Sequence, residues 1–273
     1  MPAADPADVD LLVDAAREAG RLVMGYWRRD PKVWHKAESS PVTEADIAAD
    51  DFLKERLLGA RPSYAWLSEE TADDPARLGA ARVFVVDPID GTRGFIAGGD
   101  EWVVSVALLV DDRPAAGVLY RPVTGELYRA VAGQGATLDG MPLRVREEDP
   151  SRALRVAGSS AMLRRAKAAG VEFARTGFIA SLALRIAMVA SGRIDLALAN
   201  PAAYDWDVAA ADLILGEAGG ALTDVHGRPL EYNRALPRHP ALIAAAPRLG
   251  RVAASWLDAE AGAAPGGGRG GAP

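Results

Sequence analysis

Residues 83–92 read Val-Phe-Val-Val-Asp-Pro-Ile-Asp-Gly-Thr. This stretch gives the central structural signal of the sequence. Its first four residues are apolar and mostly β-branched, which predicts a short buried strand. Asp87 and Asp90 follow that strand, Pro88 stiffens the backbone between them, and Gly91 permits a tight turn or the close approach of a ligand. Two carboxylates held close together repel unless one is protonated or a cation bridges them. Such hard oxygen ligands suit Mg²⁺, although an isolated Asp-x-x-Asp pattern is also typical of an acidic surface turn.

Two other kinds of active site contain closely spaced aspartates, and both fit this stretch less well. Aspartic proteases carry Asp-Thr-Gly, whereas Asp90 is followed by Gly91 and then Thr92. Phosphatases that form an aspartyl-phosphate carry two aspartates separated by one residue, whereas two residues separate Asp87 from Asp90.

Composition narrows the classes of function further. The chain has 273 residues, of which 49% are hydrophobic and 25% charged, an ordinary globular balance. A formal net charge of −6 argues against a broad surface for a nucleic-acid polymer. The sequence contains no Cys, which excludes disulfides, thiolate metal sites and a Cys nucleophile, and its 3 His make a multi-histidine zinc site improbable. A negative protein that handles phosphate needs metal ions or local cations.

The sequence shows no signal-peptide pattern and no apolar run of about 18 residues that would span a membrane. We therefore expect a cytoplasmic protein without a transmembrane segment, with peripheral association at the inner membrane as an open alternative.

The first half of the chain combines helices with a predicted antiparallel sheet. Asp5-Pro6 begins an amphipathic helix, and Thr43 begins a second one with Asp46 three residues later, as in a capping box. Strands are predicted at 82–86, 103–110, 115–120 and 127–131, joined by tight turns at 111–114 and 122–125 and followed by turns at 133–135 and 139–140.

The pattern changes after about residue 150. A strand around Val156, helices at 161–169 and 182–190, a strand at 194–199 and a helix at 207–218 alternate, which favours an α/β arrangement. We divide the chain into an N-terminal α+β half (1–150) that carries most candidate metal ligands, a C-terminal α/β half (151–260), and a disordered Gly/Ala/Pro-rich tail (261–273).

Three further acidic positions stand beside predicted elements. Glu69 follows the apolar run 65–67, Asp207 opens a helix next to Trp206, and Asp46 begins the second helix. Each has an ordinary explanation, namely a solvated loop for Glu69 and helix capping for the two aspartates. The neighbouring Asp205 leaves open which carboxylate of that helix matters.

Taken together, these segments resemble a known family. Trp-Leu-Ser-Glu-Glu at 66–70, the hexapeptide at 87–92, and Trp206-Asp207 with Glu-Ala-Gly-Gly at 217–220 are similar, in order and separation, to the three signatures of the inositol monophosphatase superfamily. That superfamily includes 3′(2′),5′-bisphosphate nucleotidases, histidinol-phosphatases and fructose-1,6-bisphosphatases. The resemblance covers roughly residues 8–258 and implies an α/β fold of layered α-β-α-β-α type, often dimeric and often inhibited by lithium, so that we expect a monomer or a homodimer.

The resemblance also implies roles for individual residues. The side chains that match the ligands of two or three catalytic Mg²⁺ ions are Glu69, Asp87, Asp90 and Asp207, and Ile89 matches a ligand through its backbone carbonyl. Gly91 and Thr92 match the turn that receives the substrate phosphate, so the substrate site is lined by Glu69, Ile89, Asp90, Gly91, Thr92 and Asp207. Asp46 matches the acid that pairs with the Thr92 hydroxyl, and this catalytic pair orients the attacking water.

Direct in-line hydrolysis suits this composition, because it needs no Cys or His nucleophile. Two metals about 3.5–4 Å apart bind the phosphate oxygens, activate a water and stabilise the leaving alkoxide. On this hypothesis Asp90→Asn abolishes turnover and weakens metal binding while the fold stays intact, and wild-type turnover in that variant would defeat the assignment.

Substrate choice depends on residues beyond the hexapeptide. Inositol-specific members continue with Thr-Asn-Phe, whereas this chain has Arg93-Gly94-Phe95-Ile96 and then Gly-Asp-Glu-Trp at 99–102. This is similar to the bacterial 3′(2′),5′-bisphosphate nucleotidases that recycle adenosine 3′,5′-bisphosphate in sulfate assimilation, and also to some histidinol-phosphatases. Gly94 departs from the Glu of enterobacterial nucleotidases.

Five residue positions are candidates for contact with the remainder of a substrate. Arg185 is a candidate for a second phosphate, because a guanidinium fork suits phosphate, or else a solvated helix residue. Ser159 and Ser160 lie at a predicted strand-to-helix turn. Trp66 and Trp102 are either base-stacking surfaces or, as is more usual, core aromatics.

The sequence thus predicts a magnesium-dependent phosphomonoesterase acting on a small phosphorylated metabolite, with adenosine 3′,5′-bisphosphate as the first choice. An inositol-1-phosphate or histidinol-phosphate phosphatase is the alternative within enzymes. A non-catalytic phosphate- or nucleotide-binding regulator is the alternative from another class, and a purely structural role leaves the scattered acids unexplained.

Overall fold

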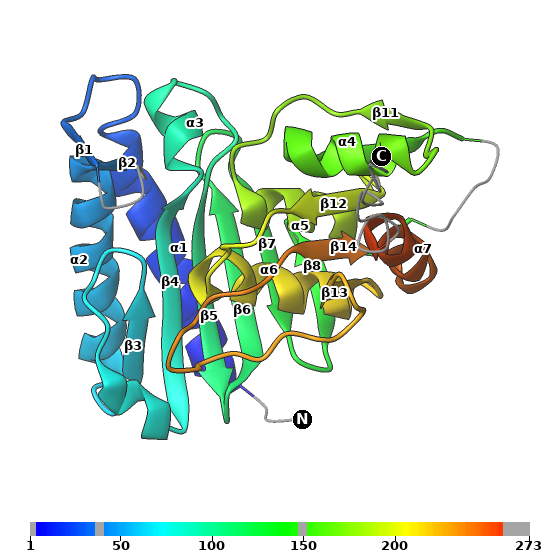
Figure 1. Cartoon of the computed structure of the whole chain (residues 1–273). Helices are drawn as coiled ribbons and strands as arrows, with labels where there is room; N and C mark the ends of the chain where they lie inside the picture. The colour runs from blue at the N-terminus through cyan, green and yellow to red at the C-terminus, as the bar shows by residue number, and fades with distance from the viewer. Residues whose placement is uncertain (1–3, 36–40, 147–151, 259–273) are drawn as a thin grey trace, which may run out of the picture.

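The structure is a computed structural model that describes residues 4–35, 41–146 and 152–258 (Figure 1). The predicted tail at 261–273 lies outside these residues. None of the described helices is long and apolar enough to cross a membrane.

A seven-stranded sheet forms the larger of two main sheets. Its order is β3 (Ala65–Ser68), β4 (Arg82–Asp90), β5 (Val103–Val110), β6 (Arg113–Arg121), β7 (Glu126–Val131), β8 (Gly135–Leu138) and β9 (Met141–Pro142). All neighbours from β4 onward are antiparallel, as predicted, whereas β3 runs parallel to β4. The parallel pair places the carboxyl ends of β3 and β4 at the same edge of the sheet.

The second sheet has the order β11 (Phe173–Arg175), β10 (Leu154–Gly158), β12 (Leu196–Ala199), β14 (Leu242–Ala245) and β13 (Ala221–Asp224). β10 pairs in parallel with β11 and β12, while β14 pairs antiparallel with β12 and β13. A separate antiparallel pair joins β1 (Val33–His35) to β2 (Pro41–Thr43).

Helices cover and separate the sheets in five layers (Figure 1). One outer layer is α1 (Pro6–Met24) and α2 (Glu44–Ala60), the middle layer is α5 (Leu182–Ala190) and α6 (Asp205–Glu217), and the other outer layer is α4 (Ser160–Ala168) and α7 (Pro247–Asp258). The short α3 (Thr92–Ile96) and the 3-10 helix η2 (Pro75–Gly79) complete the described helices. The predicted α-β-α-β-α sandwich is therefore confirmed.

The middle layer explains why the strands of the large sheet are apolar on both faces. Every residue of β5 is buried, since α1 lies against one face of the sheet and α6 against the other. The approach of α6 is close, because a Cβ on Gly117 would lie 2.9 Å from the Cα of Ala210. Only glycine fits there. The core between the sheets combines residues from both sides of the proposed boundary at 150, so the two halves share one apolar core.

β4 differs from the prediction at its carboxyl end. The strand continues to Asp90 rather than ending at Val86, and its register against β5 shifts between Asp87 and Asp90. Pro88 has no backbone N–H to donate, and the Ile89 N–H donates to Asp87 Oδ1 at 3.0 Å instead of to the sheet. The irregularity keeps both acids buried at the end of the strand.

Candidate functional site

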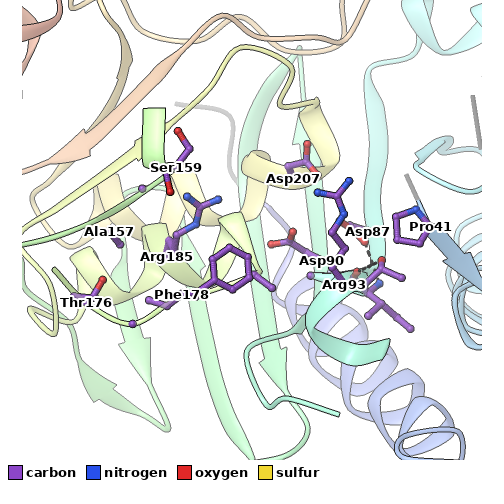
Figure 2. A pocket seen from close by; sticks show the side chains of 18 of the residues that line it. Pro41, Asp87, Asp90, Arg93, Ala157, Ser159, Thr176, Phe178, Arg185 and Asp207 are labelled. Carbon is purple, nitrogen blue, oxygen red and sulfur yellow. Dashed lines mark hydrogen bonds between the residues drawn. The ribbon is translucent and has the colours of Figure 1, made fainter. Parts of the chain in front are cut away.

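A cleft of about 380 Å³ opens where β4 ends, and four of the five acids predicted from the sequence, namely Glu69, Asp87, Asp90 and Asp207, line it (Figure 2). The N-termini of four helices of eight or more residues border it: Thr43 and Asp46 belong to α2, Ser159 to α4, Ser181 to α5 and Asp207 to α6. The N-terminus of a helix carries partial positive charge and suits anions. The surroundings of the cleft therefore favour a negatively charged ligand despite the acids inside it.

Three carboxylates form the centre of the site. Glu69, Asp87 and Asp207 each offer an oxygen, and these oxygens all lie within 4.8 Å of one another. Glu69 reaches this point because it follows β3, beside the end of β4, and its N–H donates to the Val86 carbonyl at 3.3 Å. Asp207 comes from the first turn of α6, where its Oδ2 accepts the Tyr204 N–H at 2.6 Å. The three residues come from separate segments, as the sequence predicted.

The electrostatics of this triad favour a bound cation. Burial raises the pKa of Asp87 well above its ordinary value, and repulsion from Glu69 and then Asp90 adds to the effect. The pKa of Asp207 is likewise raised, first by burial and then by Asp90 and Glu69. Each pKa is raised because ionised carboxylates lose their hydration and face one another. A divalent cation would offset both costs, and an all-oxygen donor set is the one that Mg²⁺ prefers.

Asp90 adjoins the triad but is held differently. Its Oδ2 accepts the Ser181 hydroxyl at 2.5 Å and the Ala183 N–H at 2.6 Å, and its Oδ1 accepts the Leu182 N–H at 3.3 Å. Burial raises its pKa to about 6, against the lowering effect of these hydrogen bonds. The carboxylate thus joins the end of β4 to the N-terminus of α5, while its charge still acts on Asp87 and Asp207.

The pair predicted to orient water is present. Thr92 Oγ1 lies 3.2 Å from Asp46 Oδ1 and 3.0 Å from the Ile89 carbonyl, so its single proton has two acceptors. The other oxygen of Asp46 accepts the Thr43 N–H at 2.7 Å and the Thr43 hydroxyl at 2.6 Å. The bond from the Thr43 N–H, together with the Asp46 N–H that donates to Thr43 Oγ1 at 3.4 Å, forms the predicted capping box. Burial raises the pKa of Asp46 to about 6. Asp46 is therefore both a helix cap and a partner of Thr92, two roles that the sequence pattern had set against each other.

Gly91 makes the turn after the acids possible. Its φ is 103°, which is a conformation that residues with a Cβ rarely adopt, and a Cβ there would lie 2.8 Å from the Glu101 carbonyl oxygen. The Gly94 N–H donates back to the Gly91 carbonyl at 2.7 Å. The backbone can therefore turn at once from the buried acids into α3.

Arg185 brings positive charge to the same cleft. Its Nε and Nη1 donate to the Ser181 and Leu198 carbonyls, both at 3.3 Å, and its charge lowers the pKa values of Asp90 and Asp207. Figure 2 shows the guanidinium between Ser159 and the acids. Arg185 therefore belongs to the cleft and not to an outer helix surface, and burial lowers the pKa of its guanidinium.

Comparison with known proteins agrees with this geometry. Residues 6–259 match the inositol monophosphatase family. The chain belongs to that family. It is 33% identical over 235 residues to the 3′(2′),5′-bisphosphate nucleotidase CysQ of Aggregatibacter actinomycetemcomitans, with 82% of this chain and 86% of that protein covered. It is 34% identical over 234 residues to inositol monophosphatase 3 of Solanum lycopersicum, with 80% and 86% covered. The crystal structure of the extragenic suppressor protein suhB from Bartonella henselae superimposes with a TM-score of 0.82 at 28% identity, covering 92% of this chain and 98% of that one.

Membership of the inositol monophosphatase family makes this chain a phosphatase of small phosphorylated substrates. The structure in turn removes two alternatives that the sequence had left open. The acid-rich hexapeptide is not a surface turn, since Asp87 and Asp90 are 1% and 6% exposed. Asp205 does not join the cluster either. It is buried, and it accepts the Asn233 N–H at 2.7 Å and pairs with His239 Nε2 at 2.8 Å.

The two tryptophans offered as base-stacking surfaces belong to the core instead. Trp102 is fully buried and packs edge-on against Phe95, with ring centres 5.2 Å apart. Trp66 is 8% exposed and donates its ring N–H to Thr71 Oγ1 at 3.2 Å. Neither ring is open to a ligand.

The remaining candidates line the cleft with Phe178, and Asn200, from a neighbouring pocket, contacts one of them. Ser159 caps α4 by accepting the Met162 N–H at 3.2 Å, and its hydroxyl donates to Asn200 Oδ1 at 2.8 Å, while Ser160 lines the same cleft. Asn200 and Phe178 were not predicted. Asn200 directly follows β12, and the search for polar residues at the end of a predicted strand, which identified Asp87, would also have identified Asn200. Phe178 lies in an irregular segment that gives no periodic signal.

Proposed function

We propose that this phosphatase is a magnesium-dependent 3′(2′),5′-bisphosphate nucleotidase that hydrolyses adenosine 3′,5′-bisphosphate to AMP and phosphate. The observation that supports this choice of substrate is the guanidinium of Arg185, which lies in the cleft beside the acids and toward Ser159 (Figure 2). A substrate with two phosphates can use a metal site and a separate cation, whereas a polyol monophosphate cannot.

The carboxylates of the cleft fit two or three Mg²⁺ ions. Glu69, Asp87 and Asp207 supply mutually close oxygens, and raised pKa values at Asp87 and Asp207 indicate charge that the protein alone compensates poorly. Asp90 retains lone pairs beyond those used by α5, and the Ile89 carbonyl faces Thr92 in the same turn. When bound, the ions would supply Lewis-acid stabilisation of the phosphate oxygens and of the leaving oxygen.

The residues of the chain would position the reacting groups. Gly91 and Thr92 line the cleft at the turn that would receive the phosphate to be removed. When Thr92 donates its proton to Asp46, its lone pairs accept a proton from a water, so the pair would hold that water for in-line attack. No side chain has to form a covalent intermediate.

Arg185 is suited to hold the second phosphate. Within the described residues its Nη2 donates to no protein acceptor, and its two hydrogen bonds to carbonyls are long at 3.3 Å. Ser159 lies on the same wall, and its hydroxyl would have to turn from Asn200 Oδ1 to donate to a phosphate. A fork of donors that still has hydrogen-bonding capacity matches the shape and charge of a phosphate.

A panel of substrates tests the proposal. With Mg²⁺ present, we expect kcat/KM to be highest for adenosine 3′,5′-bisphosphate among that nucleotide, inositol 1-phosphate and histidinol phosphate. Arg185→Gln should lower the value for the bisphosphate by about 10- to 100-fold, because a hydrogen bond to a charged group contributes about 1.5–3 kcal/mol. The values for the monophosphates should change little, and a strong wild-type preference for either monophosphate would overturn the choice.

Inositol-1-phosphate phosphatase activity is the second candidate, because the tomato inositol monophosphatase and the bacterial nucleotidase are almost equally similar to this chain. The same panel distinguishes the two. Metal binding without turnover of any member would instead support the regulator alternative. Inhibition by lithium would be consistent with either enzyme.

A further inference from the structure

We propose that Phe178 is a ring-stacking residue that makes the cleft favour phosphomonoesters carrying a planar aromatic base over those carrying a sugar or polyol alone. The inference deepens the proposed nucleotidase activity and rests on it. Phe178 is 80% exposed and lines the same cleft as Asp90, Thr92 and Arg185. In Figure 2 its ring is drawn between Arg185 and Asp90.

The exposure of Phe178 distinguishes it from the other aromatic residues near the site. Trp102 and Trp66 are buried, and Tyr204 stacks on Trp206 with ring centres 4.6 Å apart and an interplanar angle of 4°. Phe178 makes no ring-to-ring contact with the part of the chain that the structure describes. Its ring therefore offers an apolar face that gains by being covered.

The segment that carries Phe178 is fixed at both ends. Residues 176–181 form no helix or strand. Thr176 donates its N–H and its hydroxyl to the Val156 carbonyl, each at 3.3 Å, and Ile179 is 9% exposed and belongs to the core between the sheets. At the other end the Ser181 hydroxyl donates to Asp90 Oδ2 at 2.5 Å. The ring is thus held in place rather than carried on a free loop.

These anchors place the ring within reach of a substrate. Phe178 precedes Ser181 by three residues, which span at most about 10 Å of extended chain, and Ser181 contacts Asp90 directly. The ring is open to solvent, since Phe178 is 80% exposed. A substrate whose phosphate lies at Asp90 and Thr92 can therefore extend its organic group over the ring.

The chemistry of the ring selects the class of ligand. Aromatic bases stack on an aromatic side chain irrespective of their hydrogen-bonding pattern, whereas a polyol presents hydroxyls that an apolar face cannot satisfy. Adenine and imidazole share the planar chemistry, so adenosine 3′,5′-bisphosphate and histidinol phosphate would both gain, and inositol 1-phosphate would not.

The test compares two substrates that differ only in the base. Adenosine 3′,5′-bisphosphate and 1-O-methylribose 3,5-bisphosphate carry the same phosphates, and the second lacks the ring. We expect Phe178→Ala to lower kcat/KM for the nucleotide by about 10- to 100-fold, the factor that loss of one base stack corresponds to. The change should appear in KM, because stacking distant from phosphorus is equal in ground and transition states. The abasic substrate should be affected less than about threefold, on the scale of near-neutral surface changes.

Matched variants separate stacking from a structural effect. Phe178→Trp should keep the preference for the nucleotide, Phe178→Leu should lose most of it, and Met141→Ala, at a residue that is 71% exposed on the distant β9, should change nothing. Histidinol phosphate, assayed in parallel, shows whether imidazole uses the same ring.

The following results would overturn the inference. Equal loss on both ribose bisphosphates in Phe178→Ala would show a general effect on the site. A change in molecular mass by light scattering, together with that equal loss, would assign Phe178 to a contact between subunits. Equal kcat/KM for the two substrates in the wild-type protein, unchanged in Phe178→Ala, would exclude base stacking and leave the nucleotidase proposal intact. Hydrolysis of neither substrate would exclude both the stacking and the nucleotidase activity.

Discussion

Asp205 and Asp207 lie two residues apart in the first turn of α6, and they face opposite environments. Asp205 points into a network in which Asn233 and His239 satisfy its oxygens, and Asn233 in turn accepts from Arg77 Nη1 at 2.7 Å. Asp207 points into the cleft, toward Glu69 and Asp87. Successive residues of a helix are about 100° apart, so two residues turn the side chain by about 200°.

The comparison shows what distinguishes a structural acid from a functional one. Both acids are at the same helix end, so neither residue type nor position in the helix separates them. Asp205 has donors supplied by the folded chain, while Asp207 has carboxylates as neighbours and a raised pKa. The first contributes to stability as the protein stands, and the second becomes favourable only when a cation is added.

The largest expected effect is the loss of activity when one carboxylate of the cleft is replaced by an amide. Asp87→Asn should lower kcat/KM by about 10³-fold or more, because metal ions supply several kcal/mol of charge stabilisation in the transition state. The same change should raise the melting temperature in EDTA, since a buried, repelled carboxylate disappears. Activity and metal-free thermal melting measure the two effects, and a lower melting temperature with retained activity would contradict the comparison.

A substitution of Asp205, on the other face of α6, should show the opposite pattern: stability falls and the response to Mg²⁺ is kept. Asp205→Asn should lower the free energy of unfolding by about 2–4 kcal/mol, because an amide replaces a buried acceptor that two donors require. Stabilisation by Mg²⁺ should persist in this variant, since the acids of the cleft are intact. Urea unfolding with and without Mg²⁺ checks both points, and loss of the Mg²⁺ response in Asp205→Asn would show that the two sides of α6 are not independent.

A smaller effect concerns pH. Asp212, on the same helix, accepts the Tyr232 hydroxyl at 2.7 Å, and burial raises its pKa to about 6 from an ordinary value of 3.8. The folded state therefore holds this proton more tightly than the unfolded state. Protonated Asp212 therefore contributes fully to the free energy of unfolding below about pH 4. This contribution is lost as pH rises through about 6, which lowers the free energy of unfolding by about 1–3 kcal/mol.

Asp212→Asn should remove that part of the pH dependence, whereas Asp10→Asn at an exposed position of α1 should not. Urea unfolding at a series of pH values between 4 and 8 measures the difference. If the free energy of unfolding of Asp212→Asn depended on pH as in the wild-type protein, the titrating group would be a different residue.

The acids of the site were predictable because each stands at the end of an element with a clear pattern. The apolar run before Asp87, the capping box at Asp46 and the helix beginning near Asp207 are local features, and the structure contains all of them. The layered architecture followed from the resemblance and from alternating elements. The regular parts of the chain therefore located most of the site.

Other features depended on contacts that no local pattern encodes. Helix geometry requires Asp205 and Asp207 to diverge, but the phase of α6 is fixed by its packing against β6 and by the distant His239. The strands β11, β13 and β14 are only three or four residues long and were not predicted. Phe178 gave no signal, since its position is set by anchors to Val156 and Asp90 at the two ends of its segment.

The most direct test of the central claim is to locate the cations themselves. We predict that crystals of the protein soaked with Mn²⁺, an anomalous scatterer that substitutes for Mg²⁺, will show a peak within ligand distance of Glu69, Asp87 and Asp207. The peak should be absent from Asp87→Asn crystals treated in the same way. No peak among these carboxylates at saturating Mn²⁺, or peaks confined to other parts of the surface, would contradict the account.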